Sequence, residues 1–410
     1  MSCLAHYIAR VYDNKSVHPD GLAESQIFHT RLCAPYLDNT QTNAILVYPG
    51  SFNPPHRGHL ELLRHVFLHG VHDLHTIAAI ILPRSDQSVR AKVEKAGQTF
   101  MLGMSERSSL WEEDIAFPEW AWVYKDTTRG FSAFLERLKQ AVSDDGYDTE
   151  FVMVYGPEIG SPYDPPIGAY GCKTVIMSDI ARKASYQRSN SRIRNFENCT
   201  SWRRIPIDKD QLEHRARAKA YQAMLRMHTK SLCTDETRDM MDDVLERLDT
   251  GFVERTTLTS VAKALRDLER VLFCEYVFKG RYIQIRFVKA ETTSRKSKRM
   301  REISSSTVRE VMRKKDGGSL RAALAGMALS PDILWHHRAA WKSAAKGGTG
   351  ACVNFSPGDR DDSEPDCHDK ASIVCHSGGS AKSGVIDVAF LEGDKYQLAR
   401  FLKFSMEKEP

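Results

Sequence analysis

The sequence is most constrained over residues 44–60, which read AILVYPGSFNPPHRGHL. Residues 44–48 are a short apolar run, as expected of a strand buried on both faces of a parallel sheet. Residues 49–55 hold too many proline, glycine and asparagine residues for a helix or a strand. From Gly58 onward, apolar residues recur at three- and four-residue spacings, which predicts a helix. The stretch therefore predicts a strand, a turn and a helix, and in such a unit the turn lies at the edge where open α/β sheets bind ligands.

The chemistry of this turn suits a nucleotide. Gly50 has no Cβ, so a phosphate or a ribose can approach its backbone closely. His56 and His59 are three residues apart, so both imidazoles can point to one side of the first helical turn and donate hydrogen bonds to phosphate oxygens. The alternative is an ordinary turn with surface histidines. The whole string GSFNPPHRGH, placed after a strand and before a helix, is much more specific than a lone HxGH.

This string resembles the first signature, HxGH, of the nucleotidylyltransferase superfamily, in the form found in nicotinamide and nicotinate mononucleotide adenylyltransferases. That family transfers AMP from ATP to a nucleotide monophosphate and releases pyrophosphate. Its second signature, ISSTxxR, resembles residues 303–309, ISSSTVR, where Ser306 replaces the usual threonine and keeps the hydroxyl. The resemblance implies an α/β fold, a Rossmann-like parallel sheet with helices on both faces, and it covers about half of the chain.

The resemblance also implies which residues bind and catalyse. His56 and His59 are expected to stabilise charge on the α- and β-phosphates, and Arg309 to hold the phosphates that leave as pyrophosphate. The planar guanidinium of Arg309 can bind two phosphate oxygens at once. Further contacts to the nucleotide and its phosphates are expected from Gly50, Ser51, Phe52, Gly58, Lys92, Gly156, Glu158, Ser304, Ser305 and Ser306. Lys92 fits a solvated loop lysine equally well, and Glu158 stands where the family often has aspartate.

The substrate pocket is expected, by the same resemblance, to include Arg107, Trp111, Asp179 and Arg182. An indole such as Trp111 can stack on a base or a nicotinamide ring, or it can simply hold its helix to the sheet. Asp179 and Arg182 can instead be surface residues. We expect Mg²⁺ to arrive with ATP, held mainly by substrate oxygens and water, with no metal ligand assigned to the protein.

Composition limits the class of protein. The chain has 410 residues, enough for two or three domains, and its net charge of +5 suits a phosphorylated substrate without requiring nucleic acid. No apolar run approaches the roughly 18 residues that span a membrane, so no membrane partner is expected. Nine cysteines without CxxC pairs favour reduced thiols, and hence the cytoplasm or the nucleus.

The expected organisation divides the chain into five parts. The nucleotidylyltransferase domain takes residues 41–186 and 281–343, after an N-terminal extension of residues 1–40. A helical insertion occupies residues 187–280, a flexible low-complexity segment residues 344–384, and a C-terminal docking segment residues 385–410. The insertion has three roles left open: covering the active site, making a homo-oligomer contact, or neither. Within these parts we expect strands over residues 75–82, 120–124, 151–155, 174–177 and 281–289, and helices over residues 4–11, 22–32, 96–112, 130–142, 211–230, 235–248, 258–278, 303–315, 320–325 and 332–341.

A basic run at residues 294–301 also has three interpretations: a solvated loop, a positive field that guides a triphosphate, or a nuclear localisation signal. For the whole chain we expect an adenylyltransferase with ATP and a nucleotide monophosphate as partners, the acceptor being nicotinamide or nicotinate mononucleotide. The alternatives are a cytidylyl- or other nucleotidylyltransferase with a different phosphorylated acceptor, and a non-catalytic nucleotide sensor or scaffold.

Overall fold

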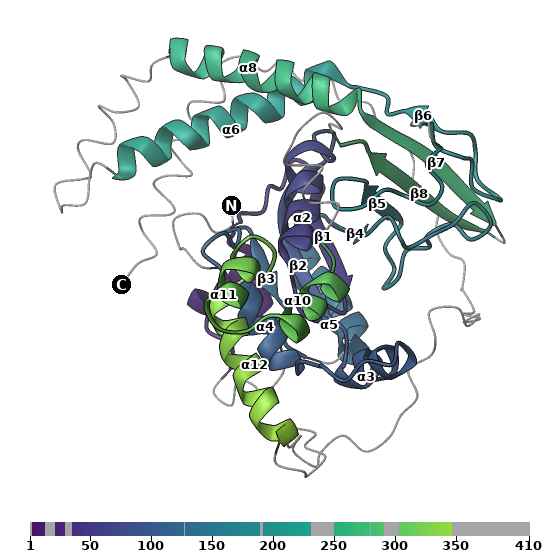
Figure 1. Ribbon diagram of the computed structural model, residues 1–410. Helices are drawn as coiled ribbons and strands as arrows, with labels where there is room; N and C mark the ends of the chain where they lie inside the picture. Colours follow the sequence, from purple (N-terminus) through teal and green to yellow (C-terminus); the bar gives the residue numbers. More distant parts are fainter. Residues whose placement is uncertain are drawn as a thin grey trace. The chain divides into compact units, whose positions relative to one another are not determined.

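The computed structural model describes residues 2–12, 21–28, 35–126, 128–188, 192–230, 250–278, 280–290 and 303–346 (Figure 1). All of them belong to one compact unit, Ser2–Pro357. The helix expected over residues 235–248, the basic run, the C-terminal docking segment and most of the low-complexity segment lie outside the described residues.

The described residues form one eight-stranded sheet in the order β3-β2-β1-β4-β5-β8-β7-β6. The first six strands in this order, β3-β2-β1-β4-β5-β8, are each parallel to the next, whereas β7 runs antiparallel to both β8 and β6. The sheet is mostly parallel and Rossmann-like, as the sequence predicted. The strands are β1 Asn43–Gly50, β2 His75–Pro83, β3 Ala121–Val123, β4 Thr149–Tyr155, β5 Thr174–Ser178, β6 Arg203–Arg204, β7 Val271–Phe278 and β8 Arg281–Val288.

Helices cover both faces of this sheet because its central strands are apolar on both sides. Ile45, Val47 and Ile80 belong to a core shared with α1 and α5, while Leu46 and Ile81 face a second core under α2 and α4. The helices are α1 Leu4–Val11, α2 Arg57–His69, α3 Asp86–Lys95, α4 Met104–Glu112, α5 Thr128–Asp144, α6 Lys209–Lys230, α8 Thr250–Leu268, α10 Ser305–Lys314, α11 Gly317–Ala325 and α12 Pro331–Lys346.

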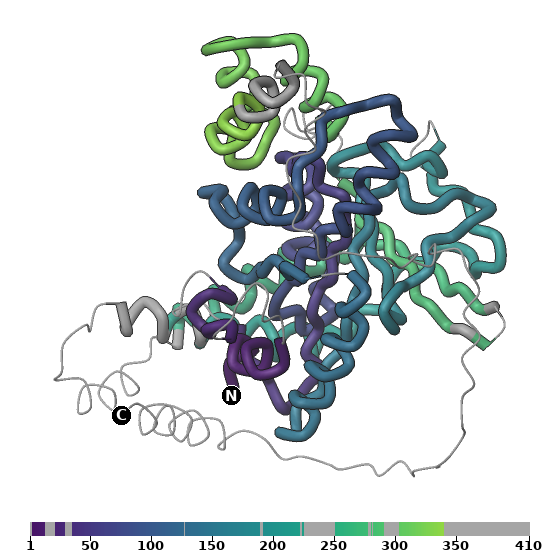
Figure 2. The backbone as a smooth tube through the Cα atoms, turned by 90° about the horizontal axis from the view of Figure 1, so that it is seen from below, coloured from purple at the N-terminus to yellow at the C-terminus, as the bar shows by residue number. Residues whose placement is uncertain are grey.

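A third, smaller core joins the helices after β8 to the rest of the unit. Val308, Met312, Leu320 and other apolar residues of α10, α11 and α12 pack against Phe100, Leu102 and Leu110. Figure 2 shows these three helices gathered as one group. This packing holds the second signature against residues 100–110, which follow the first signature in the chain.

The helix expected over residues 96–112 is wrong in its extent. The structure has two helices, α3 and α4, with residues 96–103 between them. The Oγ of Ser85 accepts a hydrogen bond from the backbone N–H of Ser88, 3.3 Å away. This N-terminal cap starts α3 at Asp86, before the residues for which a helix was expected. Gly97, with φ of +63°, follows the end of α3, where a left-handed residue is favoured.

The helix expected over residues 258–278 is also wrong in its second half. α8 ends at Leu268, and Val271–Phe278 is strand β7, paired along its whole length with β8. The insertion is therefore not wholly helical, since β6 and β7 extend the sheet beyond β8. Near the N-terminus, the described part of the helix expected over residues 22–32 is a single 3₁₀ turn, Glu24–Gln26.

The described helices of the insertion lie at the amino edge of the sheet. Arg215 of α6 donates to the side-chain oxygen of Gln41, just before β1, and to the backbone carbonyl of His72, just before β2, at 3.1 and 3.2 Å. The carboxyl ends of the strands lead instead to α2 and α3, and α10 docks beside them (Figure 1). α6 and α8 therefore leave the carboxyl edge, where α/β sheets bind ligands, uncovered.

Candidate functional site

His56 and His59 form a stacked pair at the start of α2. His56 is the N-cap, with an extended backbone, and the two ring centroids are 3.6 Å apart at an interplanar angle of 25°. The backbone N–H of His56 donates to Nδ1 of His59 at 3.2 Å. Because this nitrogen accepts, the proton of a neutral His59 sits on Nε2. Nδ1 of His56 is buried with no hydrogen-bond partner among the described residues, so it is available to a ligand.

Both histidines are held in the neutral form. Burial lowers the pKa of His56 to about 3, and the nearby positive charges of Arg182 and Arg309 add to this effect. Burial also lowers the pKa of His59 well below its ordinary value, helped by His56, Arg182 and Lys92. Each ring at neutral pH thus offers one N–H donor. An arriving polyanion would offset the cations and raise both pKa values.

Aromatic residues form the wall behind His59. The ring of Phe52 lies edge-on to His59 at 5.0 Å, and the indole of Trp111, fully buried, contacts Phe52 at 5.3 Å. Phe52 has a φ of +46°, and a Cβ on Gly50 would lie 2.5 Å from its ring. The missing side chain of Gly50 therefore makes room for Phe52, a different reason from the close approach of a phosphate that the sequence suggested. Trp111 packs in the wall and also holds α4 to the sheet.

The second signature docks directly on the first. Ser304 caps α10, its Oγ accepting from the N–H of Thr307 at 3.1 Å. Ser305 Oγ donates to the carbonyl of Pro54 at 2.9 Å. Arg309 donates through Nη1 to the carbonyl of Asn53 and through Nη2 to Ser306 Oγ, the latter at 3.0 Å. The two signatures thus meet across the Asn53–Pro54 turn.

Gly58 lies close to the His56 ring and beside the start of the second signature. A Cβ at this position would lie 3.0 Å from two ring atoms of His56 and 3.5 Å from the carbonyl oxygen of Ile303, the first residue of the second signature. A Cβ would therefore force the His56 ring to shift by a few tenths of an ångström, whereas 3.5 Å from the Ile303 carbonyl is an ordinary contact. Gly58 thus leaves room for the His56 ring where it lies.

Cations surround the histidine pair. Lys92, Arg84 and Arg182 are exposed, and none forms an ion pair within the part of the chain that the structure describes. Burial lowers the pKa of Lys92, and the charges of Arg84, Arg309 and Arg182 lower it further, whereas Glu158 opposes the shift. Such uncompensated positive charge suits a triphosphate. Arg84 directly follows β2 and was missed in the sequence, where it looks like an ordinary loop residue.

Glu158 supplies a carboxylate at this site. It is exposed and folds back over Gly156, so that a Cβ on Gly156 would lie 2.4 Å from Glu158 Oε2. The two residues follow β4 at the carboxyl edge of the sheet. The absence of a side chain at Gly156 therefore leaves room for the carboxylate in this position.

Two of the residues assigned to the substrate pocket act within the scaffold. The guanidinium of Arg107 is fully buried and donates to the carbonyls of Ser51, Arg84 and Leu102 at 2.7–3.1 Å and to Asp86 Oδ1 at 2.6 Å. It thus ties the loop after β1 to the loop after β2. Asp179 is 1% exposed and accepts from the N–H of Ala290 at 2.7 Å, so its interpretation as a surface residue is wrong.

Asp114 and Asn53 were not found from the sequence. Asp114 is buried and accepts from Arg57 Nη1, the N–H of Ala116 and the N–H of Ser330, at 2.8–2.9 Å. It thereby fastens the start of α2 to the turn before α12. Asn53 Oδ1 accepts from the N–H of Leu102 at 2.9 Å. The position of Asn53 within the first signature was its only indication in the sequence. Asp114 had none, because the segments that it joins, at Arg57 and Ser330, are distant from it in the sequence.

Residues 47–107 match the family model described as cytidylyltransferase-like, a family within the nucleotidylyltransferase superfamily. The match begins within β1 at Val47, covers the histidine pair, α2, β2 and α3, and ends at Arg107 in α4. It supports a nucleotidyltransferase activity in general, in agreement with the first signature. No curated protein matches the chain. Among the described residues, no helix is both long enough and apolar enough to cross a membrane.

Proposed function

We propose that this protein transfers AMP from ATP to a nucleotide monophosphate, with nicotinamide or nicotinate mononucleotide as the acceptor. The observation that carries the proposal is the contact between the two signatures. His56 and His59 stack at the start of α2, and Arg309 and Ser305 hydrogen-bond to the turn that leads into it. Neutral imidazole donors and a guanidinium therefore surround one place, at the edge of the sheet where nucleotides bind.

In this reaction an oxygen of the acceptor's phosphate attacks the α-phosphorus of ATP. The bond from that phosphorus to the bridging oxygen of the β-phosphate breaks, and pyrophosphate leaves. No general base is needed because the attacking phosphate is already ionised. His56 and His59 donate hydrogen bonds to oxygens on which negative charge develops, and Arg309 with Ser305 holds the leaving pyrophosphate. Catalysis then rests on positioning and electrostatic stabilisation.

The residues present fit a Mg²⁺ ion that enters with ATP. Glu158 has an exposed carboxylate beside the cations of the site, while the oxygens of Asp179 are engaged by Ala290 and Gln187. One available carboxylate suits Mg²⁺, which keeps several water ligands and takes the rest from phosphates. When bound, Mg²⁺ would neutralise charge on the triphosphate. We propose Glu158 as the protein group nearest to it.

CTP is a second candidate for the nucleotide, because the matching family is described as cytidylyltransferase-like.

The proposal is tested by measuring pyrophosphate release with ATP or CTP against a panel of phosphorylated acceptors, including nicotinamide mononucleotide, nicotinate mononucleotide and phosphopantetheine. Mass spectrometry identifies the product. We expect ATP with a mononucleotide to give the highest kcat/KM. Turnover only with CTP would show that the nucleotide substrate is CTP and not ATP. Binding of ATP in calorimetry, without turnover on any acceptor, would indicate a nucleotide sensor.

A further inference from the structure

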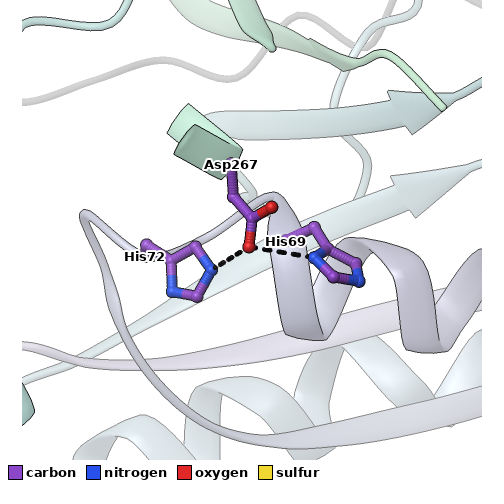
Figure 3. A group of neighbouring side chains, drawn as sticks. All are labelled: His69, His72 and Asp267. Atoms are coloured by element: carbon purple, nitrogen blue, oxygen red, sulfur yellow. Dashed lines mark hydrogen bonds and ion pairs between the residues drawn. The ribbon is translucent and has the colours of Figure 1, made fainter. Parts of the chain in front are cut away.

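Three side chains of the kinds that bind transition metals meet between α2 and α8 (Figure 3). His69 is the last residue of α2, His72 lies in the turn that follows, and Asp267 is near the end of α8. His69 Nδ1 and His72 Nε2 are each 3.0 Å from Asp267 Oδ2. The three ligand atoms all lie within 4.8 Å of one another.

These distances suit a tetrahedral zinc ion. Zn²⁺ binds imidazole nitrogen and carboxylate oxygen at about 2.0–2.1 Å, which puts tetrahedral ligand atoms about 3.4 Å apart. The two nitrogen–oxygen distances of 3.0 Å therefore need to lengthen by only a few tenths of an ångström. His69 also borders an open cavity, and 35% of its side chain is exposed, so water can reach this corner as a fourth ligand.

We propose that His69, His72 and Asp267 form a zinc site with one water ligand, which fastens the insertion to the sheet domain. His69 ends α2 and His72 lies in the α2–β2 connection, both in the sheet domain, and Asp267 comes from the insertion. The site is separate from the nucleotide site. His56 and His69 are 13 residues apart at the two ends of α2, and at 1.5 Å per residue this is about 20 Å. The proposal does not depend on the proposed function.

Lys263 competes with a metal for the same carboxylate. Its Nζ lies 3.0 Å from Asp267 Oδ2 and 3.3 Å from the carbonyl of Leu68. The side chain is 48% exposed, so it can give up Asp267 and keep Leu68. Because a lysine ammonium beside a metal ligand repels the ion, removing this charge should strengthen metal binding. The other charged side chains nearby have partners of their own. Asp73 pairs with Arg286 at 2.8 Å, and Arg215 donates to the backbone carbonyl of His72.

The test titrates the full-length chain, freed of metal with a chelator, with Zn²⁺ and separately with Co²⁺. We expect one Zn²⁺ bound, and a Co²⁺ complex with the visible absorption of tetrahedral nitrogen and oxygen ligation. His72→Ala and Asp267→Asn should each weaken Zn²⁺ binding by more than about 100-fold. Replacing a residue that only contacts a metal ligand weakens binding by about 10- to 100-fold, so a larger loss indicates a direct ligand. His214→Ala, an exposed histidine on α6, is the matched control and should bind as the parent does.

Two further measurements keep the test decisive. Lys263→Met should bind Zn²⁺ several-fold more tightly than the parent, a gain that misfolding cannot imitate. The chain's nine cysteines are alternative zinc ligands, and their involvement would show as sulfur-to-cobalt charge-transfer absorption. The proposal is overturned if binding shows that absorption and is abolished by thiol alkylation, if His72→Ala binds as tightly as His214→Ala, or if Lys263→Met leaves the affinity unchanged.

Discussion

Arg309 donates a hydrogen bond to the backbone carbonyl of Asn53, a residue 256 positions earlier in the chain. This contact joins the second signature to the first at the turn that leads into the histidine pair. The same guanidinium holds Ser306, and its Nε is buried without a hydrogen-bond partner among the described residues. Arg309 therefore both shapes the turn and keeps a donor for a ligand.

Replacing Arg309 tests this double role. We expect Arg309→Ala to lower kcat/KM by on the order of 100-fold or more, because both the phosphate contact and the brace to the turn are lost. Arg309→Lys should recover only part of this loss, because an ammonium is a point charge and cannot bridge two acceptors as a fork. Arg313→Ala, on the same helix and exposed in an ion pair with Glu310, is the control. Equal losses in Arg309→Ala and Arg313→Ala would contradict the assignment.

Replacing His59 tests electrostatic catalysis. We expect His59→Ala to lower kcat by on the order of 100-fold or more, because a donor to the charge that develops on the phosphates disappears. Far-UV circular dichroism should show that the fold survives. His6→Ala, an exposed histidine paired with Glu24, should keep the parent's rate. An unchanged kcat in His59→Ala would remove this residue from the mechanism.

A methyl group at Gly58 tests the position of the His56 ring. In Gly58→Ala the new Cβ would lie 3.0 Å from the His56 ring, so the ring must shift by a few tenths of an ångström. Displacements of this kind are costly for positioned catalytic groups, and we expect kcat/KM to fall by about 10- to 100-fold. Gly318→Ala, at the start of α11 with open space around it, is the matched control and should be as active as the parent. If both variants are equally active, the close contact at Gly58 has no catalytic importance.

The neutral state of His56 predicts a loss of stability in acid. The unfolded chain protonates this histidine near its ordinary pKa of about 6.5, whereas the folded chain does so only near a pKa of about 3. Between these values the unfolded state binds more protons, so the free energy of unfolding falls as the pH falls. From pH 6.5 to 5 this single residue accounts for about 1.5 kcal/mol. His75, with a pKa lowered to about 4, adds in the same direction.

Urea unfolding at several pH values between 7 and 5 measures this effect in the protein without ligand. His56→Asn should show a shallower pH dependence than the parent, by about 1.9 kcal/mol between pH 7 and pH 5. His214→Asn, exposed on α6, should keep the parent's slope. Parallel curves for His56→Asn and the parent would show that His56 is not held neutral by the fold.

The sequence predicts those features that local pattern and spacing encode. The strand, turn and helix around His56 form as expected, and Arg309 reaches that turn as the pair of signatures implies. α3 was not predicted, because its start depends on the cap residue Ser85, which does not stand out among the polar residues around it. The run that became β7 is apolar enough for a helix or a strand, and only its pairing with β8 decides between them.

Contacts between distant residues were beyond prediction. Arg107 holds two loops together by donating to backbone carbonyls in both of them. Every residue has such a carbonyl, so the sequence does not show which ones accept. Histidines at positions 69 and 72 are visible as a short repeat, but Asp267 lies 195 residues beyond the second of them. Nothing in the local pattern links them, because the docking of α8 on α2 brings them together.

The position of α6 and α8 at the amino edge has a consequence for how this protein can be altered. Arg215 fastens α6 at the far side of the sheet from His56 and Arg309, so changes in those helices need not disturb the catalytic edge. A label attached to an exposed position of α6 or α8 should therefore leave the histidine pair and Arg309 in place. The same sheet can carry a reporter at one end while substrates are tested at the other.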